Sequence, residues 1–199
     1  FISFSLGWPA LLLMGVGSLF VLFYTYPLKH LALGEVAVWA VWGPLMICAL
    51  VYVASGHWLE DALWLGGLYG LGPLAVILGK HTDKIADDSI RGVMTLPVLL
   101  GARNARWSIV FVAFAVPVGA MIWAVSSSQP AFLLVLGLLP MSVWVYRCLI
   151  VEGNQALTAP DQASVNAVTS PLRDTVIAFQ FAVLAGSLLT ISALVTRLM

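Results

Sequence analysis

Charged side chains gather in one short stretch of an otherwise apolar sequence. This stretch, residues 80–91, reads Lys-His-Thr-Asp-Lys-Ile-Ala-Asp-Asp-Ser-Ile-Arg and holds three of the nine acidic and three of the nine basic residues of the chain. Asp83 and Asp87 are four residues apart, so they lie on one face if a single helix continues through them. Two carboxylates this close repel each other unless a cation joins them.

The residue types of this stretch suit the binding of a phosphorylated ligand. Oxygen-only ligands favour a hard cation, and Mg²⁺ is usually held by one or two carboxylates together with phosphate oxygens. The candidate metal ligands are Asp83, Asp87 and Asp88. The remaining phosphate charge could pair with the three bases, Lys80, Lys84 and Arg91. The simpler interpretation is a solvated loop between two membrane spans, since charged loops are common in membrane proteins.

The composition indicates that these residues are positioned by membrane-spanning helices. The 199-residue chain is 61% hydrophobic and only 9% charged, whereas soluble domains carry about 25% charged residues. We therefore predict an integral membrane protein that contacts the lipid bilayer. The net charge is zero and no basic patch is present, so we expect no nucleic-acid partner.

Six apolar runs are long enough, or nearly so, to cross a bilayer, which needs about 20 residues. They are residues 4–24, 36–53, 63–78, 108–125, 132–146 and 176–198. No alternation typical of strands is present. We predict an all-α polytopic bundle in which residues 1–199 form a single transmembrane domain.

Basic residues are distributed asymmetrically between the two sides of this bundle. If the six spans alternate in direction, eight of the nine Lys and Arg residues fall on one side, and only Arg197 does not. Cytoplasmic loops are enriched in Lys and Arg, so the stretch 80–91 is predicted to face the cytoplasm.

The aspartates and the residues after them resemble a known motif. Asp-x-x-x-Asp, followed by Gly92-x-x-Thr95-Leu96 and a closing Gly101, is similar to the second aspartate-rich motif of the UbiA superfamily of intramembrane prenyltransferases. The resemblance implies that two such motifs hold a prenyl diphosphate through Mg²⁺ and that the prenyl group passes to an aromatic acceptor.

A second polar stretch, residues 24–35, strengthens the resemblance. Its Pro-Leu-x-x-x-x-Leu-Gly-Glu pattern, residues 27–35, resembles the turn after the fourth helix in the menaquinone branch, the 1,4-dihydroxy-2-naphthoate polyprenyltransferases. The resemblance implies that Lys29 contacts the diphosphate and that Tyr26 stands near the reacting allylic carbon. Taken alone, the stretch reads as an aromatic interfacial anchor followed by a turn.

The order of the two stretches, compared with the nine-helix fold of the family, implies that this chain corresponds to helices four to nine. The same resemblance implies that the first aspartate motif lies before Phe1. The register departs from the family, whose acids stand eight and four residues before the glycine, here Lys84 and Asp88. Asp83 and Asp87 lie one residue farther away, which requires a local bulge or a pairing of Asp83 with Asp88. His81 occupies a position where menaquinone-type members often carry Asn.

These observations predict a Mg²⁺-dependent membrane prenyltransferase of the type used in quinone biosynthesis. Three alternatives remain open. A terpene cyclase of the same superfamily would need no external acceptor. A transporter would need charges in the middle of its spans, which are nearly absent here. A non-catalytic membrane subunit would depend on neither Mg²⁺ nor the aspartates.

Overall fold

The computed structural model describes residues 7–24, 26–58, 60–153 and 172–198, and every regular element in these ranges is helical. Within these ranges, five helices are long and apolar enough to cross a membrane: Gly34–Ser55, Glu60–Asp83, Ala102–Ser126, Pro130–Glu152 and Arg173–Arg197. The first helix, α2 (Trp8–Tyr24), is apolar but has only 17 residues. The predicted all-α membrane bundle is confirmed, and the beginning of its first predicted span, residues 4–6, lies outside the described ranges.

Two of the spans are assembled from consecutive helical segments of different pitch. The span Gly34–Ser55 consists of α3 (Gly34–Ala40), the π-helical η2 (Val41–Leu45) and α4 (Met46–Ser55). The span Pro130–Glu152 consists of the 3₁₀-helical η3 (Pro130–Leu138), α9 (Leu139–Tyr146) and the π-helical η4 (Arg147–Glu152). A proline inside a helix removes one amide donor and clashes with the preceding turn. Pro44 accordingly lies in the wide turn of η2.

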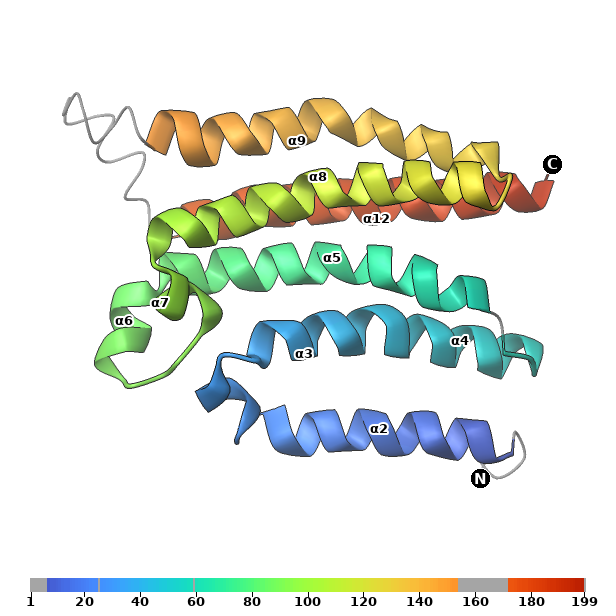
Figure 1. Ribbon diagram of the computed structural model, residues 1–199, viewed down its shortest axis with the longest axis horizontal. Helices are drawn as coiled ribbons and strands as arrows, with labels where there is room; N and C mark the ends of the chain where they lie inside the picture. The colour runs from blue at the N-terminus through green and yellow to red at the C-terminus, as the bar shows by residue number, and fades with distance from the viewer. Residues whose placement is uncertain (1–6, 25, 59, 154–171, 199) are drawn as a thin grey trace.

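The spanning helices run side by side, with α5 (Glu60–Asp83) in the middle (Figure 1). It packs against α12 (Arg173–Leu198), against α8 (Ala102–Ser126) and against the α3–α4 unit. The helix is continuous through Pro73. Because α5 packs against three of the other four spanning units, it forms the axis of the bundle.

The charged residues lie at one end of this axis. The short elements η1 (Leu28–Leu31), α6 (Ile85–Ile90) and α7 (Leu96–Leu100) gather where α2 and α5 end and where α3 and α8 begin, at the left of Figure 1. We call this region, residues 24, 26–35, 80–106, 147–153 and 172–175, the polar end. Helix direction therefore places the predicted basic loops together on one side of the bundle.

Glycines allow α5 to approach its neighbours at backbone distance. A Cβ atom on Gly43 would lie 2.6 Å from the Gly66 carbonyl oxygen and 2.8 Å from the Gly70 Cα atom. A Cβ atom on Gly79 would lie 2.6 Å from the carbonyl oxygen of Asp174. Small residues at helix crossings permit such contacts in membranes, so the glycines of α5 serve close helix packing.

We expect Gly43→Ala to destabilise the bundle by about 1–3 kcal/mol, because the added methyl meets rigid backbone rather than a mobile side chain. Thermal unfolding in detergent would measure the loss. Gly15→Ala, in the interior of α2 with nothing within 4 Å of the added carbon, is the matched control and should be neutral or slightly stabilising. Equal melting temperatures for the two variants would contradict this account.

Candidate functional site

The stretch 80–91 does not form one helix. Helix α5 ends at Asp83, Lys84 adopts non-helical angles (φ −113°, ψ 15°), and α6 starts at Ile85. The amide of Lys84 donates to the His81 carbonyl at 3.2 Å, which tightens the last turn. Asp83 and Asp87 are therefore not on one continuous helical face, and which of Asp87 and Asp88 pairs with Asp83 stays a prediction.

The carboxylate of Asp83 caps the first turn of α12. Its Oδ1 accepts a hydrogen bond from the Asp174 amide at 3.0 Å. Its Oδ2 accepts from the Thr175 amide at 2.8 Å and from the Thr175 hydroxyl at 2.5 Å. The first amides of a helix lack intrahelical partners and carry partial positive charge, so an anion stabilises them. Three of about four acceptor positions of this carboxylate are thereby used.

A buried ion pair lies directly behind this cap. Arg106 Nε of α8 donates to Asp174 Oδ2 at 2.8 Å, and Asp174 is completely buried. The neighbouring Arg173 donates to the Cys148 carbonyl and, at 3.3 Å, to Glu152 Oε2. These contacts join α5, α8, η4 and α12 at the polar end. Neither Arg106 nor Asp174 was predicted from the sequence to belong to the site. The sequence feature that could have identified Asp174 is that it is an acidic residue at the start of an apolar span.

A second buried cluster joins α3, α5 and α7. Glu35 is 1% exposed, and its Oε1 lies 2.6 Å from His81 Nδ1. The same oxygen accepts the Leu96 amide at 3.1 Å. His81 is itself 8% exposed. Glu35, noted in the sequence only as part of a turn pattern, therefore holds the last turn of α5 and the first turn of α7 together.

The remaining predicted residues lie outside these two clusters. Asp88 is half-buried, and its Oδ2 is buried without a hydrogen-bond partner. The exposed charged members of the stretch are Lys80, Lys84, Asp87 and Arg91. Tyr26 is exposed in the turn before η1. Lys29 belongs to η1, but its side chain lies outside the described part of the structure.

The unpartnered oxygen of Asp88 fits a cation better than any other atom of the stretch. A buried acceptor without a donor is costly, and a bound cation removes that cost. Among the described residues, no group of three or more His, Cys, Asp or Glu side chains converges on one point. The residues therefore fit Mg²⁺ as a partial ligand set, which is the usual situation when phosphate oxygens and waters complete the coordination shell.

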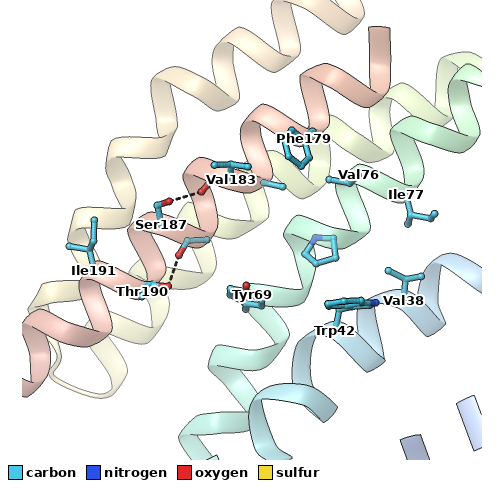
Figure 2. A pocket seen from close by; sticks show the side chains of 13 residues that line it. Val38, Trp42, Tyr69, Val76, Ile77, Phe179, Val183, Ser187, Thr190 and Ile191 are labelled. Atoms are coloured by element: carbon cyan, nitrogen blue, oxygen red, sulfur yellow. Dashed lines mark hydrogen bonds between the residues drawn. The ribbon is translucent and has the colours of Figure 1, made fainter. Parts of the chain in front are cut away.

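An apolar cavity of about 900 Å³ opens beside α5, between α3–η2 and α12 (Figure 2). We call it the main groove; its lining is Val38, Trp42, Tyr69, Pro73, Val76, Ile77, Phe179, Ala182, Val183, Gly186, Ser187, Thr190 and Ile191. Lys80 follows Val76 by four residues and Ile77 by three, so it extends the groove-lining face of α5 into the polar end. An apolar groove and a cationic side chain therefore share one helix face.

The family of the chain follows from comparison with known proteins. A model of the UbiA prenyltransferase family matches residues 1–162, and the chain belongs to this family. Comparisons with curated proteins and with solved structures returned no match. With its five spanning helices, the chain is an integral membrane protein of a prenyltransferase family. The menaquinone branch and the correspondence to helices four to nine stay predictions.

We expect Asp83→Ala to lower the free energy of unfolding by about 2 kcal/mol, because three donors at the start of α12 lose their acceptor. The melting temperature of the purified protein in detergent would report the loss. Asp87→Ala removes an exposed carboxylate four residues away and should leave the melting temperature unchanged. A stable Asp83→Ala variant would show that the cap contributes nothing.

Glu35→Ala should destabilise the protein by about 1–3 kcal/mol, since His81 and the Leu96 amide both lose a buried partner. Glu35→Gln keeps one acceptor oxygen in place and should lose less. Urea or thermal unfolding of the two variants beside Glu60→Ala, an exposed acid at the other end of α5, would test the order. The cluster has no stabilising role if all three variants unfold like the unmodified protein.

Proposed function

We propose that this protein transfers a polyprenyl group from its diphosphate to an aromatic acceptor in a Mg²⁺-dependent reaction. The observation that supports this activity best is the pairing of the main groove with a charged turn at its polar end. The groove offers an apolar surface for a prenyl chain, and the residues from Lys80 to Arg91 offer cations and carboxylates for a diphosphate and its metal. Family membership supports the same class of reaction.

The diphosphate would lie at the polar end. Lys80, Lys84 and Arg91 are exposed there, so their charges are available to phosphate oxygens at little desolvation cost. Lys29 joins them by resemblance to the family turn. In this arrangement the charged diphosphate lies near the membrane surface, and the apolar prenyl chain lies among the helices.

Asp87 and Asp88 are the proposed metal ligands whose carboxylates remain available to a cation. Mg²⁺, when bound, neutralises the charge that grows on the departing diphosphate. Asp83 remains a predicted ligand, but its carboxylate already caps α12, so in this proposal it chiefly fixes where the turn at Lys84 begins. Asp88, with its buried unpartnered oxygen, takes the leading role.

The reaction itself breaks the bond between the allylic carbon and the diphosphate oxygen. The electron-rich ring of the acceptor supplies the electron pair for the new carbon–carbon bond and then loses a proton. The apolar walls of the main groove exclude water, which would otherwise capture the allylic cation. Tyr26, by resemblance, stands near this carbon, where the face of an aromatic ring stabilises positive charge.

The acceptor proposed is 1,4-dihydroxy-2-naphthoate, as in menaquinone biosynthesis, and the proposed location of the polar end is the cytoplasmic side of the membrane. The first rests on the resemblance of residues 27–35, and the second rests on the positive-inside rule. Incubation with a prenyl diphosphate and this acceptor, with Mg²⁺ or with a chelator, would test both substrate and metal. A cyclised hydrocarbon formed without acceptor would instead identify a terpene cyclase.

Replacing either of these two proposed metal ligands should strongly lower turnover without unfolding the protein. We expect Asp87→Asn and Asp88→Asn each to lower kcat/KM by about a hundredfold, because a charge that stabilises the transition state is lost. Asp61→Asn, an exposed acid in the first turn of α5 at the opposite end, is the matched control. Product formation by both variants at the rate of the unmodified protein would overturn the assignment.

A further inference from the structure

Two side chains, Val38 and Trp42, line two neighbouring cavities. Val38 and Trp42 line the main groove, and they also line a second cavity of about 320 Å³ between α2 and α3. We call the second cavity the side groove; Phe20, Val21 and Tyr24 of α2 form its other wall. Both volumes fall within the roughly 300–1,000 Å³ of small-molecule sites. Val38 and Trp42 therefore form the wall that the two grooves share.

Trp42 is the larger part of this wall, and the backbone that follows it is closely packed. It lies in the π-helical η2, immediately before Gly43, whose backbone packs against Gly66 and Gly70 of α5. The backbone at Trp42 cannot move toward α5 without a clash, and an indole has only two side-chain torsions. Yet Trp42 is 55% exposed and lines both grooves, so its ring does not lie in the core. π-Helical turns of this kind often occur at functional positions.

The position of Trp42 along the groove gives the wall a specific use. Tyr69, which lines the main groove with Trp42 (Figure 2), precedes Lys80 by eleven residues of continuous helix. At 1.5 Å per residue, Tyr69 lies about 16 Å along the helix from Lys80 at the polar end. An apolar chain anchored by its diphosphate near Lys80 therefore passes the short side chain of Val38 first and meets the indole deeper in the bundle.

We propose that Trp42 determines which prenyl chain lengths the protein accepts, by closing the side groove to a chain that lies in the main groove. The inference rests on the proposed function for its ligand, a prenyl diphosphate. Short chains end before the indole or pack against it. Longer chains must pass it within the main groove, and a small residue at position 42 would join the two grooves and give the extra length a second path.

Binding measurements test this without requiring turnover. The protein in lipid nanodiscs would be titrated with the unreactive thiolodiphosphate analogues of geranyl, farnesyl and geranylgeranyl diphosphate in the presence of Mg²⁺. We expect Trp42→Ala to raise the affinity ratio of the longest to the shortest analogue by about tenfold, which is the discrimination that one or two methylene groups produce in an apolar pocket. Trp42→Phe should give an intermediate ratio.

Leu50→Ala is the matched control, because Leu50 is a similarly exposed apolar residue of the same span that lines neither groove. Its affinity ratio should equal that of the unmodified protein. An unchanged ratio in Trp42→Ala, or an equal change in Leu50→Ala, overturns the role of Trp42.

Turnover with the three natural donors and 1,4-dihydroxy-2-naphthoate distinguishes the two proposals. A shift of kcat/KM toward the longer donor in Trp42→Ala supports the inference. An unmodified protein that binds the analogues but forms no product with any donor argues against the proposed function, while the affinity ratios still decide the role of Trp42. If no analogue binds the unmodified protein, both proposals fail.

Discussion

The hydrogen bonds from the first turn of α12 to the carboxylate of Asp83 hold the two central helices together at the polar end. They satisfy amides that would otherwise be unpartnered, and they bring Asp174 to the position where Arg106 of α8 pairs with it. The close backbone contact of Gly79 with Asp174 follows from the same approach. Because α5 and α12 form two walls of the main groove, this cap also fixes the width of the groove at its charged end.

The polar end consists of two layers with different chemistry. The inner layer contains buried or half-buried groups whose hydrogen bonds join helices, namely Glu35, His81, Asp83, Arg106 and Asp174. Buried charges are costly unless they are paired, and each of these side chains has a partner, although Asp174 Oδ1 has none. The outer layer contains Lys80, Lys84, Asp87, Asp88 and Arg91, which are exposed or half-buried. In the proposed reaction only the outer layer changes its partners, while the inner layer keeps the turn at Lys84 in place.

The main groove makes the bilayer part of the proposed mechanism. Its lining is almost wholly apolar, and the hydroxyls of Ser187 and Thr190 donate to the backbone of α12 at 2.8 Å each. Those hydroxyls therefore add no free donor to the groove, and a prenyl chain would meet a hydrocarbon-like surface. The π-helical turn at Pro44, which places Trp42 at the edge of this surface, is a structural irregularity with a direct effect on the shape of the groove.

The sequence by itself determined the class of fold, because apolar runs of spanning length have few stable alternatives in a bilayer. It also located the chemically capable stretch, since residues 80–91 stand out against apolar neighbours. It did not show that Asp83 caps a helix ninety residues later in the chain, or that Glu35 binds His81. Those contacts depend on which helices become neighbours, and four-residue spacing within one stretch carries no information about partners in another. Only the tertiary structure shows that the aspartates differ in their surroundings. Asp83 caps a helix, and Asp88 has a buried oxygen without a partner.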